Sequence, residues 1–445
     1  MGAGWRKIWL ECLLISLTVL ALRVASLSSS PYPFRCDRTP EQHKLALDTS
    51  IRFLELEGFK VEHGEHTYGH ATEFSANPST LYGFFKFGIT PFFTLDEADA
   101  LVFYGCTPPA MRYFSYTPYV FTTPQLNRTI VFASLQDPVN SLTIRTAHDA
   151  TFSSSTLIIM TASVRTDAAV RTAFEPNLES SAMNTLKVSK ELVKLGSGAT
   201  SASALMLLSR VAIYANETEC ELYTNSTFPV LKVTRPKQGD EPVFGLPSLR
   251  SRYTGVTEDH LETTLAELAI AVIGKVTQAG YRIDYQARME RFPLDARECI
   301  AKGEDCLGDC PDAAYFADPK KFRMGSETNR DLFMVVGVNH RMLGSATYTN
   351  FGLDPFVAVT DDKFGDSAAH YLPSAPGIHN FFAYKVTRKC SVSDFYCLEV
   401  PVDKVKPTDE VRFTGRVYLN PKTTTGPAYN ETIPNYLLHF RPEIS

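Results

Sequence analysis

The chain has 445 residues, of which 44% are hydrophobic and 21% are charged, and its formal net charge at pH 7 is −5. This composition predicts a globular protein with one large core or two ordinary cores, and it excludes general disorder. The small negative charge and the lack of a long Lys/Arg run argue against nucleic acid and anionic membrane surfaces as partners.

The N-terminal segment has the pattern of a secretory signal. Arg6 and Lys7 precede a mostly apolar run from Ile8 to about Leu22, and small residues follow it. This order is typical of a cleaved leader. An uncleaved anchor is the alternative, but the run is shorter than the ~20 apolar residues that a spanning helix needs. We expect a signal peptide over residues 1–27, a secreted or secretory-pathway protein, and no membrane span after cleavage.

Sequons and cysteines agree with secretion. The N-glycosylation pattern occurs at Asn127, Asn216, Asn225 and Asn430. Of the nine cysteines, Cys12 lies in the leader, and the remaining eight predict four disulfides in an oxidising compartment.

The first element after the leader is a predicted helix that begins at Thr39. Thr39 is an N-cap candidate, Pro40 stands at the first helical position, and Gln42 completes a capping box. Gly58 stands where a left-handed C-cap belongs, so we expect the helix to end there.

Short apolar and aromatic runs separated by turns follow, and they favour strands. These runs are residues 82–87, 91–94, 100–104, 112–121, 129–134 and 141–145. The apolar run 156–162 leads into a helix pattern at 166–174, which is the beginning of a βαβ unit. Further on, residues 189–195 and 202–214 are predicted helices, and residues 219–223 and 230–233 are predicted strands.

A change in composition divides the chain. Residues 235–254 are rich in Pro and Gly and have no sustained period, so we expect a linker between an N-terminal lobe, 28–234, and a C-terminal lobe, 255–445. The second lobe begins with a long amphipathic helix pattern at 258–279. Its predicted strands are 331–338, 345–351, 380–387, 396–400 and 411–419. The fold class is α/β, or mixed α+β, with two packed lobes, mixed sheets and disulfide links.

One group of cysteines raises the choice between a metal and disulfides, and a second pair predicts a bridge. Cys299, Cys306 and Cys310 could give three thiolates to a metal, but they lack paired C-x-x-C spacing, so disulfides are preferred. Cys390 and Cys397 are close enough in sequence to be bridged across two antiparallel strands, and we predict that bridge.

The candidate catalytic residues are Asn339, His340 and Tyr348. Asn339 and His340 follow an apolar strand, where sites on α/β sheets tend to lie. A neutral imidazole there could act as a general base, with Tyr348 or Arg341 orienting a polar ligand. The alternative is a turn that uses Asn339 and His340 for local hydrogen bonds.

The candidate ligand-binding residues are Arg112, Tyr113 and Tyr116. They belong to an aromatic stretch that could form the wall of a small-molecule pocket or a ridge of the core. Arg112 could contact an anionic ligand or stack on a neighbouring tyrosine, and stacking is the preferred interpretation.

A third cluster could hold a cation. Asp362, Asp366 and His370 repeat every four residues and would share one face of a helix, with Asp361 beside them. Gly365 weakens such a helix and the order does not match an EF-hand, so a solvated acidic loop is preferred and no metal site is predicted.

Two classes of function remain. The common hydrolase, protease and nucleotide-binding signatures are missing, and no motif identifies a family or a cofactor. One class is a secreted enzyme with a polar site at strand ends, lined by aromatic residues. The other is a non-catalytic extracellular or cell-surface ligand-binding protein. The enzyme interpretation requires His340 and Arg112 to converge in one pocket.

Overall fold

The structure is a computed structural model that describes residues 36–69, 77–124, 129–198, 200–236, 239–326, 328 and 330–443. The predicted leader and Asn127 lie outside these residues.

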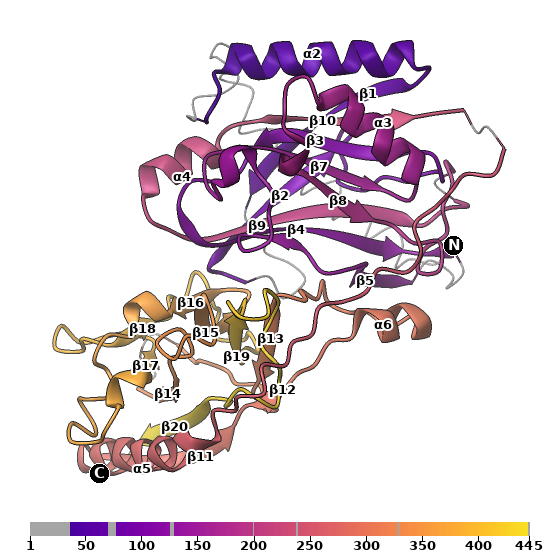
Figure 1. The fold of residues 1–445 in the computed structure, drawn as a ribbon. Coiled ribbons are helices and arrows are strands. Elements are labelled where there is room, and N and C mark those ends of the chain that lie inside the picture. The colour runs from indigo at the N-terminus through magenta and orange to yellow at the C-terminus, as the bar shows by residue number, and fades with distance from the viewer. Residues whose placement is uncertain are drawn as a thin grey trace.

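A ten-stranded sheet forms one half of the molecule (Figure 1). The strand order is β5, β4, β9, β2, β1, β10, β3, β7, β8, and β6 pairs with β4. The strands are β1 (Lys60–Gly69), β2 (Thr80–Lys86), β3 (Ala100–Cys106), β4 (Met111–Thr122), β5 (Ile130–Ser134), β6 (Val139–Asn140), β7 (Ser155–Thr161), β8 (Met183–Lys187), β9 (Ala204–Tyr214) and β10 (Phe228–Thr234). The parallel pair β7 and β8 is joined through helix α3 (Val164–Phe174), which confirms the predicted βαβ unit.

Helices α2 (Pro40–Leu56) and α3 cover one face of this sheet. The capping box of Thr39 and Gln42 begins α2, as predicted. Strand β3 is buried on both faces: Val102 and Tyr104 face the helices, whereas Leu101 and Phe103 belong to the cluster on the other face. That second cluster contains Val131 of β5 and residues of β8, the two ends of the strand order, so the sheet curls around it.

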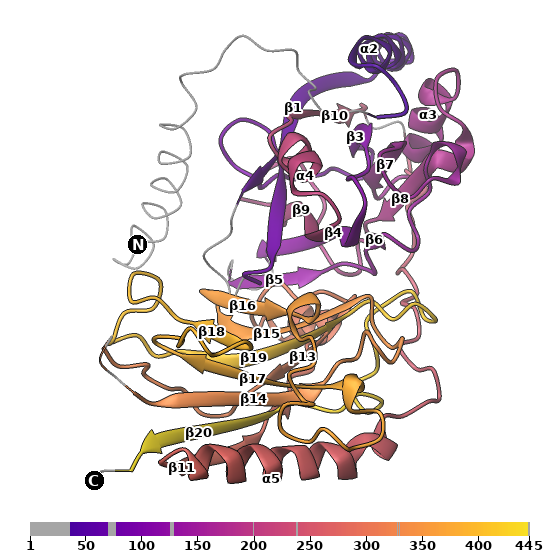
Figure 2. The ribbon, with the colours of Figure 1, turned by 90° about the vertical axis from the view of Figure 1, so that its left-hand side faces the viewer.

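The other half contains two five-stranded sheets (Figure 2). One has the order β11, β20, β14, β17, β18, and the other has the order β12, β13, β19, β15, β16. The strands are β11 (Tyr281–Arg288), β12 (Glu290–Arg291), β13 (Ala313–Ala317), β14 (Leu332–Val338), β15 (Tyr348–Asp354), β16 (Val357–Thr360), β17 (Phe381–Thr387), β18 (Cys397–Glu399), β19 (Arg412–Tyr418) and β20 (Tyr436–Pro442). Val335 and Leu437 of the first sheet share a core with Phe351 and Val417 of the second, so the two sheets pack face to face.

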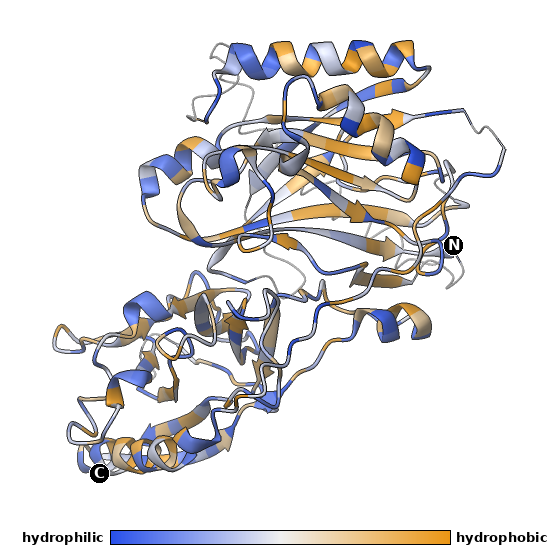
Figure 3. Ribbon diagram, viewed as in Figure 1, coloured by the Kyte–Doolittle hydropathy of each residue, from blue (hydrophilic) through white to orange (hydrophobic). Residues whose placement is uncertain are grey.

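Helix α5 (Glu262–Gln278) covers the outer face of the first of these sheets, with Leu265, Leu268 and Val272 against Val336. Figure 3 shows apolar residues concentrated on the strands, while α2 and α5 carry both polar and apolar residues, as expected of helices with one buried face. In the part of the chain that the structure describes, no helix combines the length and the apolar character needed to cross a membrane.

The chain returns to the first half after β12. Helix α6 (Ala296–Lys302) leads into Cys306, whose N–H donates to the carbonyl of Val131 in β5 at 2.8 Å. Cys306 is part of the core of the ten-stranded sheet. The chain therefore passes between the two halves again after the predicted linker 235–254. The lobe boundaries stay a prediction.

The structure contains three disulfides, Cys36–Cys106, Cys299–Cys306 and Cys390–Cys397, while Cys220 and Cys310 are free and buried. The predicted Cys390–Cys397 bridge is confirmed, but the prediction of four disulfides is wrong. The antiparallel geometry expected for that bridge is also wrong, because β17 and β18 are parallel. Three disulfides fit a protein of an extracellular or secretory compartment.

The mixed α/β class is confirmed, but several element predictions are wrong. Residues 202–214 form strand β9, not a helix, and residues 219–223 belong to helix α4 (Glu217–Thr224), not to a strand. Strand β9 lies between β4 and β2 and is buried on both faces, so its mostly apolar side chains show no period-2 alternation. Residues 141–145 and 189–195 contain turns in place of the expected strand and helix.

Candidate functional site

The predicted site residues fall into three groups with different partners. The first group lies at the end of β14, where the chain turns through Asn339 and His340. His340 Nδ1 lies 2.9 Å from Glu258 Oε1, and both side chains are buried. Because a carboxylate only accepts, His340 Nδ1 carries a proton and donates it.

Glu258 is the centre of this first group. It also accepts from Ser345 Oγ at 2.9 Å and from the Ile433 N–H at 2.9 Å. Burial opposes ionisation of Glu258, but His340 and these donors outweigh burial and lower its pKa. The pair therefore holds the turn after β14 against the start of α5 and against the segment before β20.

Asn339 bonds to its own turn and to the residue before β17. Its N–H donates to the carbonyl of Asn380 at 2.7 Å, and its side-chain oxygen accepts from the Met342 N–H at 3.4 Å. The Met342 contact is the local hydrogen bond expected of the turn that was the alternative to a catalytic interpretation, whereas the Asn380 contact joins this turn to a distant segment.

The second group joins the two halves of the molecule. Arg112, at the start of β4, places Nη1 2.5 Å from Asp361 Oδ2, and Arg341 Nε lies 3.6 Å from the same oxygen. Asp361 also accepts from the Thr349 N–H at 3.1 Å. Burial raises the pKa of Asp361, although Thr349 and the two guanidinium groups oppose the shift. Arg112 therefore has an internal anionic partner.

The aspartates and His370 do not share a helical face. Asp361–Lys363 is a short 3₁₀ turn, and turns follow it. His370 Nε2 lies 2.9 Å from Lys275 Nζ, whereas Asp361 contacts Arg112, so these side chains have separate partners. The cation site required Asp362, Asp366 and His370 to lie on one face of a helix, and the structure has no α-helix at these residues.

The third group is a layer of buried tyrosines between the halves. Tyr113 of β4 and Tyr348 of β15 both pack against Tyr418 of β19, with ring centroids 5.0 and 4.5 Å from that ring. The side chains of Tyr113 and Tyr348 are fully buried. Tyr116 lies apart from them, in the core of the ten-stranded sheet against Phe103. The predicted aromatic wall is a ridge of the core.

Sequence reasoning missed two buried aspartates in this contact. Asp309 accepts from the N–H and Oγ of Ser134, at 2.7 and 2.6 Å. Asp312 accepts from Asn140 Nδ2 at 2.9 Å and from Tyr113 Oη at 3.2 Å. Burial raises the pKa of Asp309 to about 6 and that of Asp312 to about 7. Their local sequence resembles an ordinary loop beside cysteines, and no motif distinguishes them.

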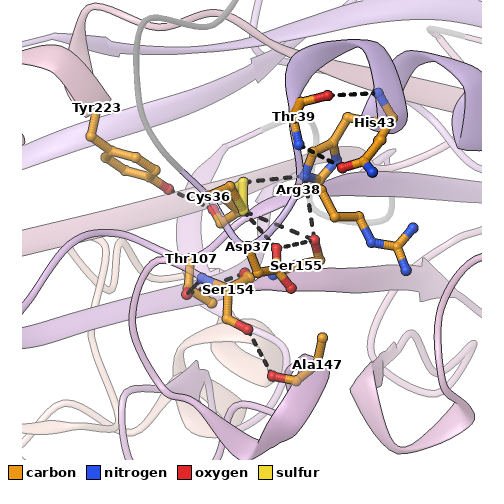
Figure 4. Close-up of a disulfide and its surroundings, with 12 residues drawn as sticks. Cys36, Asp37, Arg38, Thr39, His43, Thr107, Ala147, Ser154, Ser155 and Tyr223 are labelled. Atoms are coloured by element: carbon orange, nitrogen blue, oxygen red, sulfur yellow. Dashed lines mark hydrogen bonds between the residues drawn. A yellow bond between two sulfur atoms is a disulfide. The ribbon is translucent and has the colours of Figure 1, made fainter.

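Sequence reasoning also missed a histidine beside a disulfide (Figure 4). His43 Nε2, on α2, lies 3.5 Å from Cys106 Sγ, and Asp37 Oδ1 lies 3.0 Å from Cys36 Sγ. Ser155 Oγ donates to Asp37 Oδ1 at 2.5 Å and lies 3.3 Å from His43 Nε2. Within the described ranges, Cys36, His43 and Cys106 are the one group of three metal-ligating side chains whose ligand atoms all lie within 4.8 Å of one another. No sequence motif linked these residues, because Cys36 and Cys106 are 70 positions apart.

The loop closed by Cys390–Cys397 displays apolar side chains. Val392 is fully exposed and Phe395 is 87% exposed. Asp394 orders the loop, because it accepts from Lys385 Nζ and from the Ser391 N–H, each at 2.8 Å. Burial opposes ionisation of Asp394, but these donors outweigh burial and lower its pKa.

Two cavities lie beside the segment before β20. One, of about 310 Å³, is lined by Asp259, Glu262, Arg288, Met289, Glu290, Arg291, Ile433 and Pro434. The other, of about 270 Å³, is lined by Arg252, Tyr253, Ala428, Tyr429 and Asn430. Neither lining includes a predicted catalytic or ligand-binding residue.

Comparisons with known proteins assign no activity. No protein-family model and no curated protein sequence matches the chain. An uncharacterised protein from Burkholderia cenocepacia, at 11% identity and a TM-score of 0.42, aligns over 99% of this chain and 96% of its own. The VP54 protein of PBCV-1, fitted into a reconstruction of the virophage Sputnik, aligns over 86% of this chain and 92% of its own, at 6% identity and a TM-score of 0.14. Neither similarity is strong enough to support a function.

Proposed function

We propose that this chain is a secretory-pathway glycoprotein that acts as a non-catalytic binding protein, and that the loop 390–397 contacts another protein. The observation that carries the proposal is the display of Val392 and Phe395 on a loop closed by a disulfide. The two residues are three positions apart on one short loop, and contiguous exposed apolar surface marks interaction sites.

The loop is preorganised for binding. The Cys390–Cys397 bond and the contacts of Asp394 with Lys385 and Ser391 restrict its conformations before any partner arrives. Restriction in the free state reduces the entropy lost on association. Complete burial of a Val or Phe side chain contributes about 1.5–3 kcal/mol, so two such anchors can dominate a small interface.

The charges beside the loop favour a protein over a lipid surface. Lys385 is paired with Asp394, and the exposed Lys389 is balanced by the exposed Glu399. A loop that inserts into an anionic membrane is expected to carry a cluster of Lys and Arg. The partner we infer is a protein surface with an apolar pocket and a rim of mixed charge.

The alternative of an enzyme centred on His340 has less support. His340 is hydrogen-bonded to Glu258 and Arg112 is paired with Asp361. Tyr348 stacks on Tyr418, so the three residues lie in three separate contacts. An active site needs such polar groups to converge on one accessible point.

The test is binding of the purified, fluorescently labelled protein to intact cells of the organism that makes it. We expect saturable binding that falls at least tenfold in the Val392→Ser/Phe395→Ser double variant. Leu56→Ser is the matched control, because Leu56 is 87% exposed on α2 in the other half of the molecule. Equal binding by the wild type and the double variant, or no saturable binding by the wild type, would reject the proposal.

A further inference from the structure

Four potential metal ligands meet where the segment before α2 lies on β3 and β7. Cys36 and Asp37 precede α2, His43 lies in its first turns, and Cys106 is the last residue of β3. Cys36, Cys106 and His43 provide two sulfurs and one ring nitrogen that all lie within 4.8 Å of one another. Asp37 Oδ1 lies 3.0 Å from Cys36 Sγ, at the edge of this group (Figure 4). This donor set is independent of the loop 390–397 and of the function proposed for it.

The spacing of these atoms suits zinc. Zinc binds sulfur at about 2.3 Å and nitrogen or oxygen at about 2.0–2.2 Å in a tetrahedron, so neighbouring ligand atoms lie about 3.3–3.8 Å apart. Cys106 Sγ and His43 Nε2 are already 3.5 Å apart, and Cys36 Sγ is 3.0 Å from Asp37 Oδ1. Breaking the sulfur–sulfur bond lets the two sulfurs separate to the spacing that a shared ion requires.

The surroundings hold the nitrogen and oxygen ligands in place. His43 is 8% exposed, and one of its ring nitrogens lies within 4.8 Å of both sulfurs. The N–H and Oγ of Ser155 both donate to Asp37 Oδ1, at 3.0 and 2.5 Å, and hold the carboxylate beside the sulfurs.

The site is accessible from one side. Asp37 is exposed and Cys36 is half-buried, whereas Cys106 and His43 are buried behind them. A dissolved reductant and a hydrated ion can thus approach from the side of Cys36 without unfolding the sheet.

We propose that reduction of Cys36–Cys106 converts this disulfide into a zinc site formed by Cys36, Cys106, His43 and Asp37. A dithiol reductant transfers two electrons and two protons to the disulfide, giving two thiols, and is itself oxidised to a disulfide. Zn²⁺ then binds both sulfurs as thiolates and releases the two protons to solvent, with His43 Nε2 and Asp37 Oδ1 as the other two ligands. The segment before α2 stays linked to β3 in both redox states.

The test measures Zn²⁺ uptake against a chromophoric indicator, after reduction with a phosphine that binds the metal weakly. The background protein carries Cys299→Ser, Cys306→Ser, Cys390→Ser and Cys397→Ser, so that the other bridged cysteines cannot contribute. We expect one equivalent of Zn²⁺ in the reduced form and none in the oxidised form. His43→Gln and Asp37→Asn should each weaken binding by about ten- to a hundredfold. His63→Gln, an exposed histidine on β1, is the control and should change nothing.

Two results would overturn the proposal. The first is Zn²⁺ uptake that is equal with and without Cys36→Ser/Cys106→Ser, and the second is uptake that His43→Gln leaves unchanged. If the serine background does not fold, X-ray absorption of the reduced, zinc-loaded wild type replaces it. Two sulfur neighbours with lighter N/O neighbours support the site, whereas four sulfurs or none would refute it.

Discussion

The contact between the two halves depends on single buried polar residues. Asp312 joins the loop after Cys310 to Asn140 and to Tyr113 of the ten-stranded sheet. Asp309 joins the same loop to Ser134 at the end of β5. Burial makes the charged form of each carboxylate unfavourable, so this contact is sensitive to pH.

The first prediction concerns Asp312. Its pKa in the folded protein is about 7, above its ordinary value of 3.8, so the folded state binds more protons than the unfolded state between these values. Stability should therefore decrease as the pH rises from about 4 to about 7. Asp312→Asn should remove this contribution and make the protein more stable at pH 8, by on the order of 1–4 kcal/mol.

Urea unfolding of the wild type and Asp312→Asn at pH 5 and pH 8 checks this prediction. Asp403→Asn, at an exposed position, is the matched control. Identical pH dependence in the wild type and Asp312→Asn would show that Asp312 is ionised in the folded state at pH 5.

The second prediction concerns His340 and Glu258. His340→Ala leaves the Glu258 carboxylate buried without its imidazole partner, so it should cost about 3–5 kcal/mol at pH 7. Ser345→Ala removes one donor to the same carboxylate and should cost about 1–2 kcal/mol. Because the pKa of Glu258 is lowered in the folded protein, its contribution is complete above the usual glutamate pKa and is lost as the pH falls through the folded value.

Urea unfolding at pH 7 and pH 3 provides the comparison, and the cost of His340→Ala should shrink at pH 3. If His340→Ala were instead neutral for stability at pH 7, the pair would not be structural, and the catalytic interpretation of His340 would regain support.

Among the helices and strands, those marked by residues close together in the chain could be predicted from the sequence. The start of α2 was predictable because Thr39, Pro40 and Gln42 carry the capping chemistry within four positions. The βαβ unit was predictable because an apolar run leads directly into a helix pattern, although the structure places the N-cap at Ser163, before the predicted start of the helix. Strand β9 was not predictable, because a strand covered on both faces is mostly apolar without alternation and resembles a buried helix.

The candidate site depended on information that a single sequence does not contain. His340 and Glu258 are 82 positions apart, and Arg112 and Asp361 are 249 positions apart. Residue type and strand-end position drew attention to His340 and Arg112, but their partners are determined by tertiary packing. The turn at Asn339 could be predicted from the sequence because its side-chain partner, Met342, is three positions away. The bond from the Asn339 N–H to Asn380 could not.

The third prediction concerns the start of α2. Thr39→Ala removes the side-chain acceptor of the Gln42 N–H and should lower stability by about 0.5–2 kcal/mol. Thr49→Ala is the matched control, because Thr49 lies within the same helix and bonds only to the preceding turn, at the Leu45 carbonyl. Amide hydrogen exchange should speed up in the first turn of α2 in Thr39→Ala alone. Equal exchange in the two variants would show that the cap does not stabilise this turn.

At the scale of the whole molecule, the disulfides constrain chain segments of very different length. Cys36–Cys106 spans 70 positions, whereas Cys390–Cys397 spans 7. In the loop-entropy model, these bridges contribute about 4 and about 2.5 kcal/mol, respectively.

We therefore expect Cys36→Ser/Cys106→Ser to destabilise the oxidised protein by about 2 kcal/mol more than Cys390→Ser/Cys397→Ser does. Urea midpoints of the two double variants, measured without reductant, give the comparison. A larger loss of stability in Cys390→Ser/Cys397→Ser would indicate that local contacts of the loop 390–397, and not loop length, determine how much each disulfide stabilises the protein.

The last prediction concerns where sugars lie on the whole molecule. Asn216, Asn225 and Asn430 are exposed, and the first two stand at the two ends of α4. Asn216 also caps α4, because its Oδ1 accepts from the Glu219 N–H at 3.3 Å. A glycan is attached through the side-chain nitrogen, so the cap and the glycan can coexist on Asn216.

Two substitutions separate these roles of Asn216. Thr218→Ala destroys the sequon and leaves the cap, whereas Asn216→Gln removes both. After expression through the secretory pathway, intact-mass measurement with and without an amidase that removes N-glycans should show one glycan fewer in both variants. Only Asn216→Gln should also lose about 1 kcal/mol of stability. A secreted wild-type product whose mass the amidase leaves unchanged would contradict glycosylation at all of these positions, and it would remove the sequons as support for a secretory-pathway location.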